Sequence, residues 1–268
     1  MLKEKIKAGQ PIYGTGYTAL THAWTSSLKK ADLDFAFIDT EHISMNRAEM
    51  ARACETLKAM GIAPIVRISY ADPNLASMAV DAGAIGIVAP YIETVDQAKQ
   101  LVGAVKYKPL KGYTLNQLIN GKEKPSEKLK TYLDKLSEDL LCIANIESVK
   151  AMENLDSILS VEGLDAVFIG PHDLSVSLGL PEEYDNPLFE SAVKEIIQKT
   201  RKKGLSIGIH FSQSPERQIK WVNEGANIIL HSFDIALFTQ KLIQDLHIIR
   251  QGIGDDMSKN INNENIII

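Results

Sequence analysis

Residues 34–42 read DFAFIDTEH, an apolar run that ends abruptly in an acid, a hydroxyl, an acid and a histidine. The run shows none of the alternation of a half-exposed strand and is typical of a strand buried on both faces of a parallel sheet. A strand of this kind delivers its last polar side chains to one edge of the sheet. The fold depends on whether the same pattern recurs.

Eight apolar runs bounded by turn residues occur along the chain, and a helical pattern follows most of them. The runs are PIYGTG (11–16), DFAFID (34–39), APIVRI (63–68), AIGIVAP (84–90), LLCIANIE (140–147), LDAVFIG (164–170), LSIGIH (205–210) and ANIILH (226–231). Eight such units in about 250 residues match a (β/α)₈ barrel, the TIM barrel. An open doubly wound sheet is the alternative, but no GxGxxG or GxxxxGKS loop follows any strand. We expect a single α/β TIM-barrel domain.

Two segments fall outside the repeat. Residues 116–139 are polar and too long for a simple connection, so we expect a helical excursion on the surface, near the active site or an interface. The tail, residues 251–268, is rich in asparagine and is expected to be disordered. The barrel domain is therefore assigned to residues 1–250.

Composition narrows the functional class. The net charge of −5 argues against the clustered basic surface that binds nucleic-acid phosphates. No stretch approaches the roughly 20 apolar residues of a membrane span. Cys54 and Cys142 lie in an expected helix and strand, and buried free thiols suit a reducing cytosol. We expect a cytoplasmic protein without a nucleic-acid or membrane partner.

The carboxyl ends of barrel strands build the active site. Beside His42, those ends carry Arg67, Glu147, Asp173, His210 and His231. Each has a plain structural explanation: the acids as helix caps or loop residues, the arginine as an ion-pair partner, the last two histidines as structural groups. Their convergence on one rim favours a site.

The chemistry of this set is that of an acidic metal site. Glu147 and Asp173 offer hard oxygen ligands that suit Mg²⁺ or Mn²⁺. The turn GPHDLS resembles a helix start, whose N–H groups could bind a substrate carboxylate. Arg67 could stabilise an oxyanion and His42 could move a proton. No lysine ends a strand, which disfavours a Schiff-base aldolase. Metal-assisted enolisation of a 2-oxo acid fits better than a Schiff-base mechanism.

The same stretches carry a family resemblance. FAFIDTEH, PIVRI, AVDAGAIGIVAPYIETVDQA, ANIESVKAMENLDSIL and GLDAVFIGPHDLSVSLG resemble the HpcH/HpaI aldolase family. The likeness runs from LKEKIKAGQPIYGT to LHSFDIALF. It implies a class II, metal-dependent pyruvate aldolase of the 4-hydroxy-2-oxoheptanedioate or 2-keto-3-deoxy-sugar-acid type. Such an enzyme reversibly cleaves a 4-hydroxy-2-oxo acid to pyruvate and an aldehyde through a metal-stabilised pyruvate enolate.

Residue roles follow from this resemblance. It implies that Glu147 and Asp173 bind the metal, Mg²⁺ or Mn²⁺ with Co²⁺ as a further candidate. It implies that Arg67 stabilises the enolate oxygen and that His42 transfers a proton. It also implies that Asp81 pairs with this histidine. Because Asp81 precedes a strand, however, it belongs at the opposite rim and could reach a site only from a neighbouring subunit. The substrate contacts implied are Arg67, Asn145, Gly170, Pro171 and His172.

The resemblance further implies a homo-oligomer, a hexamer built as a trimer of dimers, with the last helix exchanged onto a partner barrel. Three departures from the family pattern leave the aldehyde open. LKGYTLNQL replaces a Gly-x-Arg-Gly turn, Asn145 replaces a glutamine, and His172 replaces a small residue. His172 could also change how Asp173 sits or add a metal ligand.

Two other functions stay open. The first is a carbon–carbon lyase or synthase that acts on a CoA thioester, as in citrate-lyase-like relatives, with the lysines of GKEKPSEKLK forming a nucleotide groove. The second is a non-catalytic 2-oxo-acid binding protein. The pathway, the preferred metal and the exact oligomer are not given by the sequence.

Overall fold

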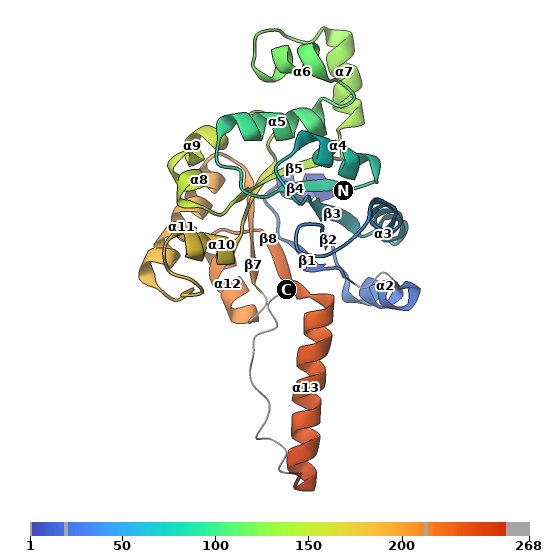
Figure 1. Ribbon diagram of the computed structural model, residues 1–268, viewed down its shortest axis with the longest axis vertical. Coiled ribbons are helices and arrows are strands. Elements are labelled where there is room, and N and C mark those ends of the chain that lie inside the picture. Colours follow the sequence, from blue (N-terminus) through green and yellow to red (C-terminus); the bar gives the residue numbers. More distant parts are fainter. Residues whose placement is uncertain (1, 19–20, 212–213, 256–268) are drawn as a thin grey trace.

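Eight parallel strands form a closed barrel in the computed structural model, which describes residues 2–18, 21–211 and 214–255 (Figure 1). Each strand pairs with the next along the chain, and β8 pairs with β1. The strands are β1 (Ile12–Gly16), β2 (Phe35–Asp39), β3 (Ala63–Arg67), β4 (Gly86–Ala89), β5 (Leu141–Ile146), β6 (Ala166–Ile169), β7 (Ser206–Phe211) and β8 (Ile228–Phe233). All eight lie within or over the apolar runs, and the TIM-barrel prediction is confirmed.

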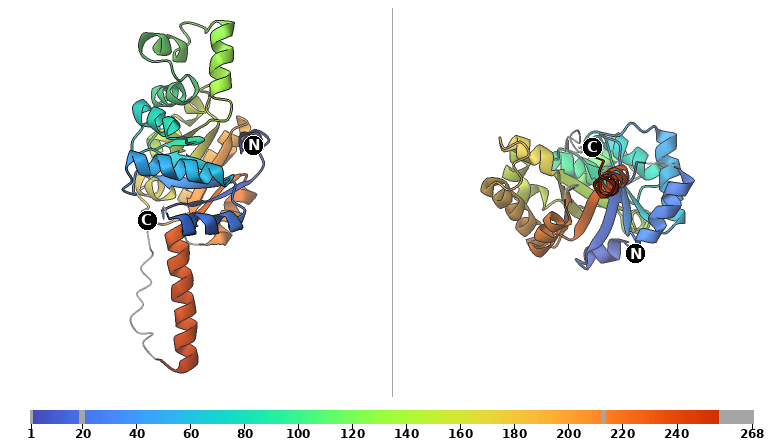
Figure 2. Two further views of the ribbon diagram at one scale, coloured as in Figure 1. Left: turned by 90° about the vertical axis from the view of Figure 1, so that its right-hand side faces the viewer. Right: turned by 90° about the horizontal axis from the view of Figure 1, so that it is seen from below.

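Helices connect the strands and cover the outside of the barrel (Figures 1 and 2). They are α1 (Leu2–Lys7), α2 (His22–Leu28), the 3₁₀ turn η1 (Lys29–Ala31), α3 (Arg47–Ala59), α4 (Pro73–Asp81), α5 (Val95–Lys106), α6 (Gly112–Ile119), α7 (Glu127–Leu136), α8 (Val149–Glu153), α9 (Leu155–Ile158), α10 (Pro171–Ser177), α11 (Pro187–Lys202), α12 (Pro215–Asn223) and α13 (Asp234–Ile253). Local sequence fixes their starts. Asn46 and Glu49 form a capping box that begins α3.

The strands are buried on both faces, which explains their uninterrupted apolar character. In β2, Phe35 and Phe37 pack inside the barrel, where the Phe37 ring stacks on Phe168 of β6. The alternate residues Ala36 and Ile38 pack outward against the helices. Cys54 and Cys142 are free and buried, as expected.

Helices α6 and α7 occupy the expected excursion between α5 and β5. Since α5 runs back from the carboxyl ends of the strands and β5 starts at the other end, both helices lie at the amino-terminal rim (Figure 1). Lys3 Nζ in α1 donates a 3.0 Å hydrogen bond to the carbonyl of Ser137 just after α7. The excursion is therefore remote from the rim on which the strand-end residues lie.

Helix α13 projects away from the barrel on the side opposite α6 and α7 (Figures 1 and 2). Its base is held by the buried carboxylate of Asp234, which accepts hydrogen bonds from Thr18 N at 3.0 Å and from Trp24 Nε1 at 2.8 Å. Beyond the base, nine large apolar side chains of α13 are exposed: Ile235, Leu237, Phe238, Leu242, Ile243, Leu246, Ile248, Ile249 and Ile253.

The prediction that disorder begins at residue 251 is wrong. Helix α13 continues to Ile253 and ends where Gly254 takes a left-handed φ of 73°. Glycine adopts this conformation without the steric penalty of a Cβ, so the helix stops there. Residues 256–268 lie outside the described part of the chain. No described helix is both long enough and apolar enough to cross a membrane.

Candidate active site

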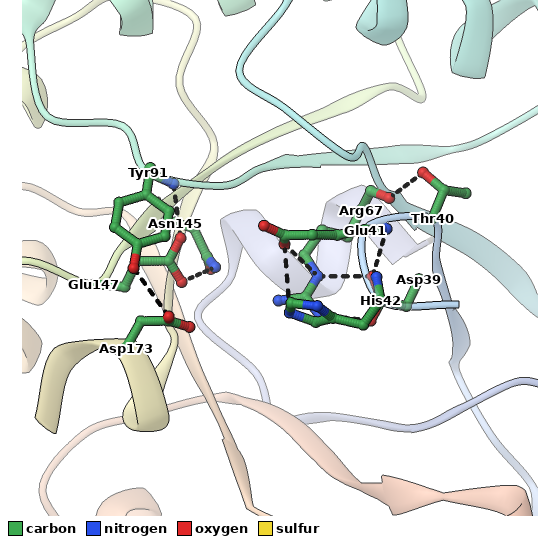
Figure 3. A network of polar contacts seen from close by, with 9 residues as sticks. All are labelled: Asp39, Thr40, Glu41, His42, Arg67, Tyr91, Asn145, Glu147 and Asp173. Atoms are coloured by element: carbon green, nitrogen blue, oxygen red, sulfur yellow. Dashed lines mark hydrogen bonds and ion pairs between the residues drawn. The ribbon is translucent and has the colours of Figure 1, made fainter. Parts of the chain in front are cut away.

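The strand-end residues gather at the carboxyl-terminal rim of the barrel in two adjoining groups (Figure 3). One group comes from the end of β2 and from β3, and comprises Asp39, Glu41, His42 and Arg67. The other comes from the ends of β4, β5 and β6, and comprises Tyr91, Asn145, Glu147 and Asp173. Strand register explains the first group, because Asp39 pairs directly with Arg67 across β2 and β3.

Arg67 is held by two carboxylates. Its Nε donates to Asp39 Oδ1 at 2.9 Å and its Nη2 donates to Oδ2 at 2.5 Å, a bidentate pair. Glu41 Oε2 lies 3.2 Å from Nε of the same arginine. The guanidinium also sits over the Phe37 ring, 5.6 Å from its centroid. The plain explanation of Arg67 as an ion-pair partner is thus confirmed, although Nη1 has no hydrogen-bond partner among the described residues and stays available to a ligand.

The charges of this group are set by burial and by their pairing. Burial alone would raise the pKa of Asp39, but the hydrogen bonds and charge of Arg67 outweigh it and keep that pKa below its usual value. Burial raises the pKa of Glu41, even though Arg67 opposes the rise. His42 Nε2 lies 3.9 Å from Glu41 Oε2, and half of the His42 side chain is exposed. His42 is therefore open to solvent and to a ligand.

Glu147 is the most enclosed acid of the second group, with 1% of its surface exposed. Its Oε1 accepts from Tyr91 N at 2.7 Å, and its Oε2 accepts from Asn145 Nδ2 at 2.6 Å. A Cβ on Gly170 would overlap Oε2, so a glycine is needed at the end of β6. Burial raises the pKa of Glu147 to about 7 against the hydrogen bond from Tyr91, and the charge of Asp173 adds to the rise.

Tyr91 joins the two acids of this group. While its main-chain N–H binds Glu147, its hydroxyl donates to Asp173 Oδ1 at 2.9 Å (Figure 3). Burial, followed by the hydrogen bond to Asp173 and the charge of that acid, raises the pKa of Tyr91, so the hydroxyl stays protonated and remains a donor. Two carboxylates from neighbouring strands are thus fixed to one residue.

The donor set fits a hard divalent cation. Within the described ranges no group of three or more His, Cys, Asp or Glu side chains could hold a metal, so the protein would supply two carboxylates and leave other positions to water and substrate. Asn145 Oδ1 is a further buried oxygen, and it has no hydrogen-bond partner among the described residues. A set of oxygen donors with an unsatisfied buried acceptor suits Mg²⁺ or Mn²⁺ rather than a thiolate-bound ion.

The other predicted residues differ in their position and surroundings. Asp81 ends α4 at the amino-terminal rim, where it is exposed and paired with Lys108. His172, in the first turn of α10 beside Pro171, has Nδ1 3.7 Å from Glu182 Oε1. His210 packs edge-on against the Phe233 ring. Burial, aided by the charge of Arg67, lowers its pKa to about 4.

His231 is a different case, because its Nδ1 is buried without a hydrogen-bond partner in the described structure. Tyr91 is the site residue that sequence reasoning missed. Its signal was its position, two residues after the end of β4, a strand for which no polar end group had been assigned. A tyrosine there can reach the acids that follow the next two strands.

A TIM barrel that carries buried carboxylates, an arginine and a histidine on its carboxyl-terminal rim has the layout of a barrel enzyme. Comparison with known proteins then gives the family. The chain belongs to the HpcH/HpaI aldolase/citrate lyase family, whose sequence profile matches residues 17–240. The resemblance drawn from the sequence is confirmed, and the chain is a lyase enzyme.

Three relatives illustrate the range of this family. The 2-keto-3-deoxy-L-rhamnonate aldolase of Escherichia coli O17:K52:H18 is 27% identical over 250 residues, 93% of each chain. The crystal structure of an HpcH/HpaI aldolase from Desulfitobacterium hafniense DCB-2 superposes with a TM-score of 0.81 at 26% identity, and the match covers 94% of this chain and 97% of that one. The crystal structure of the citrate synthase SbnG superposes with a TM-score of 0.80 at 26% identity, and the match covers 96% of this chain and 100% of that one.

Proposed function

We propose that this enzyme reversibly cleaves a 4-hydroxy-2-oxo acid to pyruvate and an aldehyde. The observation that carries the proposal is the pair of acids Glu147 and Asp173, tied to Tyr91 beside the Arg67 group. The name of the Escherichia coli relative supports a 2-keto-3-deoxy sugar acid as the kind of substrate.

Glu147 and Asp173 would hold a divalent metal, Mg²⁺ or Mn²⁺, with Co²⁺ as a further candidate. When bound, such an ion supplies Lewis-acid chemistry that polarises the 2-oxo group and acidifies the adjacent carbon. Gly170 contributes by leaving room for the carboxylate of Glu147. Asn145 contributes by donating to that carboxylate, and its free Oδ1 can accept from a substrate hydroxyl.

Arg67 would stabilise the oxygen that becomes negative when the bond breaks. Cleavage breaks C3–C4, leaves the electron pair on C3 as the enolate of pyruvate, and releases the proton of the 4-hydroxyl as C4 becomes the aldehyde. Since Asp39 holds Nε and Nη2, Arg67 is fixed with Nη1 free to donate to the developing oxyanion. Pro171 and His172 open α10 at the same rim and would contact the substrate carboxylate.

His42 would take the hydroxyl proton and return one to C3. It is exposed enough to meet a substrate, and Glu41 beside it can orient the ring. Asp81 cannot help within one chain, because it lies at the other rim. Its proposed pairing with His42 therefore requires a second subunit.

We propose a homo-oligomer, with a trimer of dimers as the expected form, because the pairing of Asp81 with His42 requires a second subunit. The exposed apolar side chains of α13 support this proposal, because apolar surface of that extent on a projecting helix is typical of a protein interface. Exchange of α13 onto a partner barrel would bury it.

Loss of the methyl proton signal of pyruvate in D₂O, followed by NMR, tests the function without knowledge of the aldehyde. We expect exchange with Mg²⁺ or Mn²⁺, none with EDTA, and none in Glu147→Ala. Glu153→Ala, which removes an exposed acid of α8, is the matched control. Absence of exchange with every metal would refute the proposal.

A CoA-thioester reaction is the second candidate, supported by the likeness to the citrate synthase SbnG. The lysines of GKEKPSEKLK do not support it, because the segment runs from the turn after α6 into the start of α7 at the amino-terminal rim, remote from Glu147. Metal-dependent turnover of acyl-CoA and a 2-oxo acid, without exchange in pyruvate alone, would favour this candidate.

A further inference from the structure

Tyr91 makes two separate hydrogen bonds to the proposed metal ligands. Its main-chain N–H binds Glu147 Oε1 at 2.7 Å and its hydroxyl binds Asp173 Oδ1 at 2.9 Å (Figure 3). In the described part of the chain no other residue donates to both acids. The two bonds leave from opposite ends of one residue, so its conformation sets the spacing of the carboxylates.

The backbone of Tyr91 has a φ of +47°, which places a bulky residue in the left-handed region. Such a conformation is unfavourable for side chains with a Cβ and persists only where the surroundings enforce it. Here the loop is bound on both sides. Gln97 Nε2 donates to Tyr91 O at 3.4 Å, and Ile92 N donates to Asn145 O at 3.2 Å. The left-handed backbone conformation of Tyr91 is therefore maintained, and it directs the main-chain N–H toward Glu147.

The ring of Tyr91 is not held by the hydrophobic core. The residue is 42% exposed, so packing does not require a tyrosine at this position. A glycine would adopt the same backbone with less strain. What a tyrosine adds is the hydroxyl that reaches Asp173.

We propose that Tyr91 is a positioning residue that holds Glu147 and Asp173 at the spacing a divalent cation requires. This inference rests on the proposed metal-dependent function and assigns the residue that preorganises its ligands. Partners that orient ligating carboxylates typically change metal affinity by about 10-fold to 100-fold when removed. Tyr91 acts through the acids, so its loss weakens binding without removing a ligand.

Isothermal titration with Mn²⁺ tests the inference on the full chain. Tyr91→Phe keeps the ring and removes only the hydroxyl, and we expect its Mn²⁺ dissociation constant to rise about 10-fold or more. Tyr91→Gly, which suits the left-handed backbone, should show the same loss because it also lacks the hydroxyl. Tyr113→Phe, which changes an exposed tyrosine of α6, is the matched control and should bind as the wild type does.

A second measurement separates positioning from a general structural effect. With Mn²⁺ raised to saturation, Tyr91→Phe should regain a pyruvate exchange rate close to that of the wild type, because both ligands remain. Unchanged Mn²⁺ affinity in Tyr91→Phe would overturn the inference and leave the proposed function standing. A wild type that binds no Mn²⁺ would overturn both.

Discussion

Replacing Glu147 by glutamine should stabilise the metal-free protein at neutral and alkaline pH. The carboxyl is buried, and burial raises its pKa from 4.5 to about 7. Between these two values the folded state keeps a proton that the unfolded state releases. The contribution of Glu147 to the free energy of unfolding therefore falls as the pH rises through this range and is constant above it.

The magnitude follows from that difference in pKa. Each unit of pKa is worth about 1.4 kcal/mol, so ionised Glu147 destabilises the fold by about 3 kcal/mol at a pH of about 8. Glutamine has the same shape and no charge. Its Oε1 can accept from Tyr91 N. Its Nε2 would face Asn145 Nδ2, but rotation of the Asn145 amide brings the unpartnered Oδ1 into place as an acceptor.

The assay is urea unfolding in EDTA, for wild type and Glu147→Gln, at several pH values. The advantage of the variant should grow by about 3 kcal/mol between a pH of about 4.5 and about 8. Glu153→Gln, which alters an exposed acid, should show no such trend. An advantage that stays constant with pH would refute the assignment of a raised pKa to Glu147. The same substitution should abolish Mn²⁺ binding, so stability and function oppose each other at this residue.

Three further results are expected. Gly170→Ala should eliminate measurable Mn²⁺ binding, because the new Cβ would overlap Glu147 Oε2 and lie 3.2 Å from its Cβ; binding equal to the wild type would contradict this geometry. Asp39→Asn should lower the free energy of unfolding by about 3 kcal/mol near neutral pH, since it leaves Arg67 without its bidentate partner. The deficit should shrink in acid, because the lowered pKa of Asp39 gives stability that is lost as the pH falls through it. Leu242→Glu on α13 should reduce the mass measured by light scattering, and an unchanged mass would show that this helix is not an interface.

The strands could be predicted from sequence because each is buried on both faces, so its run is short, apolar and bounded by turn residues. DFAFID and LDAVFIG leave little choice of secondary structure. The end of α13 was harder, because most large apolar side chains along the helix are exposed and give no core signal. Polar composition after residue 250 suggested disorder, whereas the helix ends at Gly254.

Within the site, the acids could be predicted because carboxylates at neighbouring strand ends must come close together. Tyr91 could not, because its role depends on a left-handed backbone and on two contacts to residues 56 and 82 positions away. The sequence allowed Arg67 to be an ion-pair partner without naming the acid, and the register of β2 and β3 places Asp39 directly beside it.

The buried carboxylate of Asp234 fixes the direction of α13. Thr18 and Trp24 donate hydrogen bonds to that carboxylate, so the start of the helix is tied to the barrel. At about 1.5 Å per residue, its 20 residues form an arm of about 30 Å. If α13 docks on a second copy, the direction of the helix fixes the rotation that relates the two copies. When such a rotation divides a full turn the copies close into a ring, and when it does not they continue as a filament. If α13 docks on a second copy in this way, the direction that Asp234 gives to the start of the helix decides between a finite particle and a fibre.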